Sequence, residues 1–235
     1  MKNYQISILA AAVMVTAYVP TTHAEGNISF SFSPPPVTSV AGPGQSINKG
    51  NVGVTFLEFE AGDETTEFSL LNLNLLSKND GKYWSLGLVS GEDDTGAISM
   101  LGLAGMVGVE QISPSGVIIS AGVGVNYLYT EFDSALVYAE TYLTTIPANV
   151  TFQKRFALDE RIGVTPYLTL NAVPFGFGTV DSNSVGGVSS EDIEFDPYLG
   201  LQLGFDVDLN GVSLSAYYQS ADDSSVTNLS VGFEF

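Results

Sequence analysis

Apolar and polar residues alternate with a period of two along most of this 235-residue chain. Residues 195–207, FDPYLGLQLGFDV, show the alternation most clearly, because mainly leucine and phenylalanine occupy one face while Gly, Gln, Tyr and Asp occupy the other. Residues 119–129 and 142–152 repeat this scheme. Alternation of this kind is typical of β-strands with different surroundings on their two faces, whereas a helix would show a period of 3.6 residues. Since no convincing helical stripe is present, the chain is predicted to be all-β.

Turn signals divide the alternating segments into ten strands, with eight or twelve as the alternatives. The first two strands are the least regular, because adjacent apolar pairs such as Phe56–Leu57 and Leu70–Leu71 break the alternation. A β-bulge in either strand would account for these pairs. The predicted strands are residues 50–60, 66–77, 82–90, 97–110, 117–130, 138–153, 162–175, 193–207, 211–220 and 226–235.

The connections between these strands are of two kinds. Short turns, two of which contain the Asp-Gly or Asn-Gly dipeptides that tolerate positive φ, fall at residues 78–81, 113–116, 157–161 and 208–211. Longer polar and acidic loops fall at residues 61–66, 91–96, 131–134, 176–192 and 221–225. Because the two kinds alternate strictly, the sequence predicts an up-and-down antiparallel sheet with both chain ends on the short-turn side.

Charge follows the same division. The chain has 7 basic and 26 acidic residues, a formal net charge of −19, although only 14% of its residues are charged. Acidic residues are expected mostly in the loops. This balance argues against binding of nucleic acid, which requires basic patches. Apart from Lys2, every basic residue is expected at or beside the short-turn end: Lys49, Lys78, Lys82, Lys154, Arg155 and Arg161.

The first 24 residues are typical of a secretory signal peptide. Lys2 provides the positive end, residues 6–19 the apolar run, and Thr22-His23-Ala24 the small-x-small cleavage site. The apolar run is shorter than the ~20 residues that a membrane-spanning helix needs. Cleavage would leave a mature chain without histidine or cysteine and with a formal charge of −20, because six basic residues would remain against 26 acidic ones.

Residues 25–49 precede the first predicted strand and are rich in proline and glycine. This composition predicts an extended periplasmic leader. A plug inserted into the following domain is the alternative. The domain itself is predicted to span residues 50–235.

The last strand ends in NLSVGFEF, with Phe233 and Phe235 at alternate positions. Together with the signal peptide, the absence of cysteine, the ten strands and the two kinds of connection, this ending resembles the bacterial outer-membrane β-barrel proteins. The resemblance implies a closed transmembrane barrel in contact with outer-membrane lipid, with its short turns on the periplasmic side. It also implies that the barrel-assembly machinery recognises Phe233 and Phe235, although Ser230 stands where the family often has glycine. A secreted soluble β-sandwich, which also alternates, is the competing fold.

Outer-membrane barrels carry a girdle of aromatic residues at each membrane interface. The predicted girdle at the turn end contains Trp84, Phe205, Phe233 and Phe235. The predicted girdle at the loop end contains Tyr127, Tyr129, Tyr142, Phe195 and Tyr218.

The opposite face of each strand is predicted to line the barrel interior. Barrels of about eight strands are filled by side chains and barrels of ~16 leave a channel, so ten strands leave both outcomes open. Tyrosines packed over facing glycines would close the lumen, whereas uncovered small residues would leave a narrow wet pore. The predicted lining residues are Asn126, Tyr167, Asn171, Tyr198, Gly200, Gln202, Gly204, Tyr217 and Gln219.

Three charged residues near the turn end, Arg155, Arg161 and Asp206, are also predicted to point inward. A pair between Arg161 and Asp206 would brace neighbouring strands or gate a passage, and bracing is the favoured interpretation.

Two functions follow from these features. The first is a narrow passive pore for small solutes that prefers cations, because the acidic loops would concentrate cations at its mouth. The second is a non-conducting structural or surface barrel that interacts through its acidic loops, with residues 176–192 as the binding element. The oligomeric state is left open.

Catalysis is not expected, because a serine without a positioned base is only a hydroxyl and the mature chain lacks histidine and cysteine. No cofactor is predicted. No metal site is predicted either, since the acidic run Gly91–Gly96 lacks the ligand spacing of an EF-hand.

Overall fold

The computed structural model describes residues 46–61, 64–134, 137–159, 162–184, 187–193, 195–221 and 224–235. The predicted signal peptide, nearly all of the predicted leader and Arg161 lie outside the described residues. The described strands are β1 (Ile47–Ala61), β2 (Glu64–Asn79), β3 (Lys82–Asp93), β4 (Ile98–Ile112), β5 (Ile118–Asp133), β6 (Val137–Gln153), β7 (Phe156–Ala157), β8 (Ile162–Ser184), β9 (Gly187–Asp192), β10 (Tyr198–Leu209), β11 (Val212–Ala221) and β12 (Ser224–Glu234).

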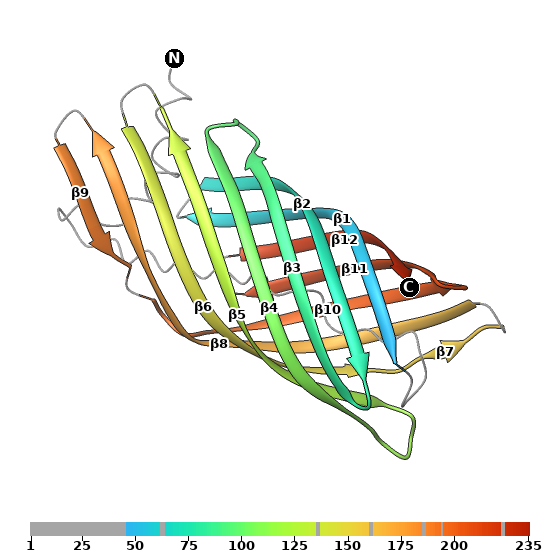
Figure 1. Cartoon of the computed structure of the whole chain (residues 1–235). Helices are drawn as coiled ribbons and strands as arrows, with labels where there is room; N and C mark the ends of the chain where they lie inside the picture. The colour runs from blue at the N-terminus through green and yellow to red at the C-terminus, as the bar shows by residue number, and fades with distance from the viewer. Residues whose placement is uncertain are drawn as a thin grey trace.

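Ten of these strands form a closed antiparallel ring (Figure 1). Consecutive ring strands pair with each other, β8 pairs with β10, and β12 returns to pair with β1 from Lys49↔Glu234 to Phe59↔Ser224. Closure gives the backbone of every ring strand a partner on both sides, as a wall in lipid requires. The predicted ten-strand up-and-down barrel is therefore confirmed.

The other two strands extend the ring strand β8. β7 pairs with its beginning through Phe156↔Val164. β9 pairs with its end, from Thr179↔Asp192 to Ser184↔Gly187. The prediction of a 17-residue loop at residues 176–192 is therefore wrong in part, because β8 continues to Ser184 and returns as a β-hairpin. Its Gly, Ser and Val residues gave no strong alternation from which this hairpin could be recognised. The other predicted long loops are also shorter than expected, because the strands continue into them: β1 ends at Ala61 and β2 begins at Glu64, and β11 ends at Ala221 and β12 begins at Ser224.

The irregular apolar pairs in the first two strands have a different cause from the one expected. β1 and β2 pair without a register shift from Ile47↔Lys78 to Ala61↔Glu64, so there is no bulge between them. Leu57 and Leu70 instead point into the barrel, where each is 1% exposed. The register shift between β6 and β8 lies at Ile146/Ala148, around Pro147, whose missing N–H cannot continue the ladder.

The outer wall is apolar, as the alternation predicts. On β10, for example, Leu199, Leu201 and Leu203 are 76%, 43% and 53% exposed. Between them the inward Gly200 and Gln202 are buried. Among the described residues, no helix is long and apolar enough to cross a membrane.

Two of the predicted short turns contain pairs of residues with left-handed backbone. Asp80 and Gly81 have φ of 50° and 69°, and Asn210 and Gly211 have φ of 61° and 91°. Positive φ at both central residues matches the twist of an antiparallel hairpin. The Asp-Gly and Asn-Gly signals are thus confirmed as tight turns.

Candidate functional site: the barrel interior and the loop end

Charged side chains form the layer of the interior nearest the short turns. Lys49 on β1 reaches across β12 and β11 to Asp206 on β10, with 3.3 Å between Nζ and Oδ2, and these side chains are 3% and 1% exposed. Lys78 on β2 pairs with Glu110 on β4, and both side chains are almost fully buried. Buried pairs of this kind hold strands in place but break at high cost.

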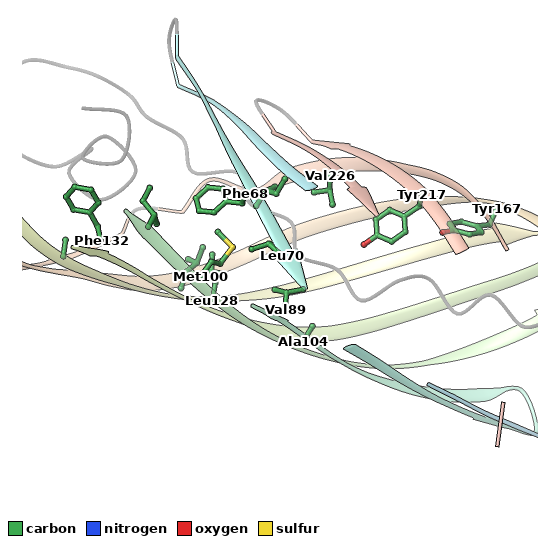
Figure 2. Packing of buried hydrophobic residues seen from close by; sticks show 14 residues of the cluster. Phe68, Leu70, Val89, Met100, Ala104, Leu128, Phe132, Tyr167, Tyr217 and Val226 are labelled. Carbon is green, nitrogen blue, oxygen red and sulfur yellow. The ribbon is translucent and has the colours of Figure 1, made fainter. Parts of the chain in front are cut away.

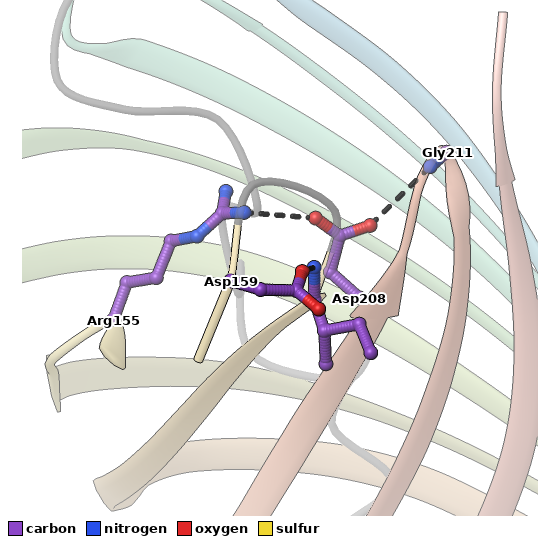
Figure 3. A network of polar contacts seen from close by, with 5 residues as sticks. Arg155, Asp159, Asp208 and Gly211 are labelled. Carbon is purple, nitrogen blue, oxygen red and sulfur yellow. Dashed lines mark hydrogen bonds and ion pairs between the residues drawn. The ribbon is translucent and has the colours of Figure 1, made fainter. Parts of the chain in front are cut away.

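A third ion pair lies at the rim of this layer (Figure 3). Arg155 Nη2 donates to Asp208 Oδ2 at 2.9 Å, and the backbone N–H of Gly211 donates to the other carboxylate oxygen at 3.3 Å. Asp208 thus ties the turn between β10 and β11 to the end of β6. Asp206 and Arg155, both predicted to point inward, therefore have the partners Lys49 and Asp208. Because Arg161 lies outside the described residues, its predicted pair with Asp206 stays a prediction.

A polar layer lies above the ion pairs. Its side chains bond across strands, as in Thr151 Oγ1 to Thr169 Oγ1 at 2.8 Å. Thr55 accepts from Asn72 at 3.0 Å and from Asn228 at 2.8 Å, which links β2 and β12 through β1. The Gln202 side chain, 1% exposed, is different, because neither its amide nitrogen nor its amide oxygen has a hydrogen-bond partner among the described residues.

A cluster of buried apolar side chains lies in the interior towards the loop end (Figure 2). Its largest side chains come from β1, β2 and β5: Leu57, Phe68 and Phe132 are each at most 2% exposed. Val89 and Leu143, from β3 and β6, are also buried in this cluster. The sequence did not reveal this apolar layer, because the same residue types were expected to face lipid.

Further down the inner wall, two tyrosines pack over glycines of neighbouring strands. Tyr167 of β8 lies over Gly204 of β10, where any Cβ would clash with its ring and hydroxyl. Tyr83 of β3 lies in the same way over Gly108 and Gly122 on β4 and β5. The first contact is the tyrosine-over-glycine packing considered from the sequence, and the second was missed.

The predicted lining residues all lie on inward-facing positions of the ring. All are buried except Gly204, which is half-buried beneath Tyr167: Asn126, Tyr167, Asn171, Tyr198, Gly200, Gln202, Tyr217 and Gln219 are the buried ones. Whether any of them lines a water-filled path stays a prediction.

Most predicted girdle residues face outward. Trp84 and Phe205 are 44% and 47% exposed near the turn end, and Tyr127 and Tyr218 are 36% and 50% exposed near the loop end. Phe195 differs, because it precedes β10 instead of belonging to it and packs against the interior, with its ring centroid 5.9 Å from that of Tyr198.

The end of β8 adds two outward aromatic residues that the sequence analysis missed. Phe175 and Phe177 are 65% and 62% exposed. Phe177 lies opposite Thr144 of β6, which in turn lies opposite Tyr127 of β5. The three positions form one row around the outer wall, so Phe177 continues the girdle that Tyr127 begins.

Above this row, towards the long loops, a cluster of tyrosines surrounds two carboxylates. Glu131 of β5 and Glu140 of β6 lie directly opposite each other, a like-charge arrangement that is unfavourable in a sheet. Hydroxyls of Tyr129 and Tyr138 each donate to Glu140 at 2.8 Å, and that of Tyr142 donates at 3.1 Å. These bonds hold the pKa of the Glu140 carboxyl below its usual range. The cluster therefore keeps its negative charge at the outer rim.

The acidic run at residues 91–96 has a structural role in the geometry of its turn. Asp93 accepts from the backbone N–H of Ile98 at 2.9 Å and from the Thr95 hydroxyl. In the part of the chain that the structure describes, no group of three or more metal-ligating acidic, histidine or cysteine side chains is close enough to hold an ion.

The outer hairpin, formed by residues 179–184 of β8 and 187–192 of β9, projects at the loop end (Figure 1). No described strand pairs with the far edge of β9. Its residues 187–190 are exposed, with Val188 at 79%. A free edge with unpaired backbone groups can accept a further strand.

No protein-family model matches the sequence, and a comparison with curated proteins found no match. Among solved structures, the β domain of the Bordetella autotransporter BrkA is similar with a TM-score of 0.50 and 10% identity, over 81% of this chain and 98% of that domain. The translocator domain of the autotransporter NalP from Neisseria meningitidis has a TM-score of 0.51 and 10% identity, over 82% and 89%.

A third similar structure, the outer-membrane protease OmpT from Escherichia coli, has a TM-score of 0.48 and 6% identity, over 84% of this chain and 99% of that one. At such identities the likeness concerns the fold alone. On that level the resemblance expected from the sequence is confirmed: the protein has the closed barrel fold of outer-membrane β-barrel proteins.

Proposed function

We propose that the protein is an outer-membrane barrel whose lumen is sealed by its own side chains and which acts at the cell surface through the outer hairpin. The observation that carries this proposal is the apolar layer of the interior. Leu57 and Phe68 lie opposite each other on the neighbouring strands β1 and β2, and Phe132 of β5 belongs to the same buried cluster, each at an exposure of 1–2%. A layer of this kind excludes water, and hydrophobic constrictions stop ions by dewetting.

The ion pairs Lys49–Asp206 and Lys78–Glu110 support a seal at the opposite end. Both cross at least one intervening strand on the inner wall and are nearly fully buried. Ion pairs between strands hold the strands of the wall together, which is what a sealed structural barrel requires.

A bilayer recording tests the seal. The purified mature chain is placed in planar lipid membranes in KCl, and heat-modifiable mobility on a gel verifies its folding. We expect folded protein with no unitary current. Discrete, cation-selective steps from the unmodified protein would contradict the sealed lumen and support a pore.

A narrow passage for cations is the second candidate, and Gln202 favours it. Within the part of the chain that the structure describes, its buried amide group has no partner, and such groups are commonly satisfied by internal water. If the apolar layer is the barrier, Phe132→Ser with Phe68→Ser should convert a silent barrel into a conducting one. Phe56→Ser, which changes an outward residue 45% exposed, is the matched control and should stay silent.

The surface role is assigned to the outer hairpin because its edge is free and polar. The chain contains no native cysteine, so Ser189→Cys can carry a photoreactive label on intact cells. A surface role predicts a reproducible cross-linked protein that is lost when Val188→Asp is added. Absence of any adduct at Ser189, with normal barrel folding, would count against the hairpin as the interaction element.

The proposal places both chain ends in the periplasm and retains recognition of the final strand by the assembly machinery. Phe233 and Phe235 support the latter, since they are 52% and 78% exposed on the outer wall where a lateral partner can reach them. Phe235→Ala should slow assembly in cells while leaving refolding in detergent unchanged. Catalysis is not part of the proposal, because the predicted mature chain contains no histidine or cysteine.

A further inference from the structure

The outer wall contains a large apolar hollow of about 860 Å³. It lies across β12 and β1 to β5, on the side that faces lipid. Its margins are leucine and phenylalanine side chains, including Leu75 at 47%, Leu86 at 51% and Phe235 at 78% exposure. Unlike the interior, this hollow is open to the surroundings of the barrel.

The hollow exists because two outward positions lack side chains. Gly50 of β1 and Gly105 of β4 both line it, among neighbours that carry large apolar residues. A Cβ on Gly105 would meet only Leu86 Cδ2 at 3.5 Å, and one on Gly50 would meet Leu75 Cδ2 and Phe235 Cε1 at 3.6 Å. These are ordinary contacts, so the sites have room for a side chain and the backbone is not strained there.

Strand register gives the hollow its length. Phe233, Gly50, Leu75, Leu86, Gly105 and Val125 lie opposite one another in turn, from β12 to β5. Five inter-strand steps of ~4.8 Å make this row about 24 Å long. Because barrel strands tilt by about 35–45°, this row runs obliquely through the hydrocarbon region, so an acyl chain can lie along it at a slant.

A positively charged side chain, Lys82, lies near the turn end of the same wall. Lys82 begins β3 and is exposed, on the same outward face as Trp84 and Leu86. At ~3.3 Å per residue it lies about 13 Å along the strand from Leu86. An ammonium group at that distance can meet a lipid phosphate while the attached chain occupies the hollow.

We propose that this hollow is a specific binding site for one diacyl phospholipid, with an acyl chain over Gly50 and Gly105 and the phosphate at Lys82. The site is distinct from the general lipid contact of a barrel wall because it combines a recess with a single cation. The proposal rests on the membrane placement given above, but not on whether the lumen conducts.

The tryptophan near the site provides the measurement. Trp84 is the only tryptophan of the chain, so its fluorescence reports on brominated acyl chains nearby. The full mature barrel is placed in micelles of a nonionic detergent, which has no phosphate group, and increasing fractions of brominated phosphatidylglycerol or phosphatidylethanolamine are added. The site predicts quenching that saturates at a low brominated fraction, whereas general wall contact gives quenching proportional to that fraction.

Variants separate the two parts of the site. Gly105→Leu, or Gly50→Leu if the first folds poorly, fills the recess and should remove the saturating component. Lys82→Gln should raise the half-saturating fraction several-fold. Ala216→Leu on the outward face of β11 and Lys154→Gln at another part of the turn end are the controls, and both should match the unmodified protein.

The same variants also distinguish lipid from a second copy of the chain. Native mass spectra from mild detergent should show one retained phospholipid per barrel, lost in Gly105→Leu. A doubled mass that Gly105→Leu converts to a monomer, or proportional quenching in every variant, would overturn the proposal. Absence of quenching by any brominated lipid would instead contradict the membrane placement itself.

Discussion

At the scale of single residues, small side chains on the inner wall are explained by what lies over them. Gly204 makes room for Tyr167, and Gly232 makes room for Asn51 and the stem of Lys49, which crosses β12 to reach Asp206. From the sequence, such glycines are equally compatible with a wet pore. In the structure, the contacts of Gly204 and Gly232 with large neighbouring side chains explain why these positions are glycine.

Gly204→Ala tests this packing. The added methyl would clash with Tyr167 and with the backbone oxygen of Ala216, and overpacking of a tightly packed site costs about 1–3 kcal/mol. Urea unfolding in lipid vesicles should show a loss of this size. Gly105→Ala, on the outer wall with only ordinary contacts, is the control; an equal loss in both variants would indicate a general cost of replacing strand glycines.

Lys49→Met tests the buried ion pair. Removing the ammonium leaves Asp206, which is 1% exposed, buried without this partner, and breaking such a pair typically costs about 3–5 kcal/mol. The double variant Lys49→Met/Asp206→Leu should recover most of the loss, because apolar replacement of both partners is often neutral. If Lys49→Met alone has no effect on the unfolding free energy, the pair does not stabilise the barrel.

At the scale of elements, β1 shows that two faces can both be apolar for different reasons. Phe56 faces outward at 45% exposure, whereas its neighbour Leu57 lies in the apolar layer at 1%. Where the lipid-facing side and the interior are both apolar, both faces of the strand carry the same residue types. The period-two pattern then no longer tells the two faces apart. The adjacent apolar pair therefore marks the point along β1 where the interior turns from polar to apolar.

Leu57→Ala should destabilise the barrel by about 2–5 kcal/mol, the usual cost of truncating a packed core leucine. Phe56→Ala, one residue away, should cost less, because its ring faces lipid in the folded state and leaves no enclosed cavity. Equilibrium unfolding of both variants in the same vesicles provides the comparison. Equal costs would mean that the interior near Leu57 is not a packed layer.

At the scale of the whole molecule, the barrel is asymmetric from one end to the other. The buried ion pairs lie near the short turns, while the apolar layer, the tyrosine–carboxylate cluster around Glu140 and the outer hairpin lie towards the long loops. The proposed orientation sets the second end at the cell surface.

Single cysteines test this orientation. With no native cysteine present, Ser189→Cys on the exposed outer hairpin should react with a membrane-impermeant maleimide on intact cells. Ser115→Cys, exposed in a short turn, should react only after the outer membrane is opened. Reversal of the two results would place the short turns outside.

The sequence by itself determined the number of ring strands, their order and their outward faces, because period two and turn chemistry are local properties that closure does not alter. Asp80–Gly81 and Asn210–Gly211, for example, form tight turns because these residue types tolerate the positive φ that the turns require. The sequence also predicted inward positions of the polar layer, such as Asn171 and Gln202, but not those of the apolar layer.

Only the tertiary structure decided what the inward residues do. Lys49 meets Asp206 from 157 positions away, and the apolar layer joins residues from Leu57 to Val226, so neither is visible in a local pattern. The outer hairpin and the lipid-facing hollow likewise depend on pairing between strands. Register across a closed ring brings distant positions into one layer, and that register is fixed by packing of the whole barrel and not by any single segment.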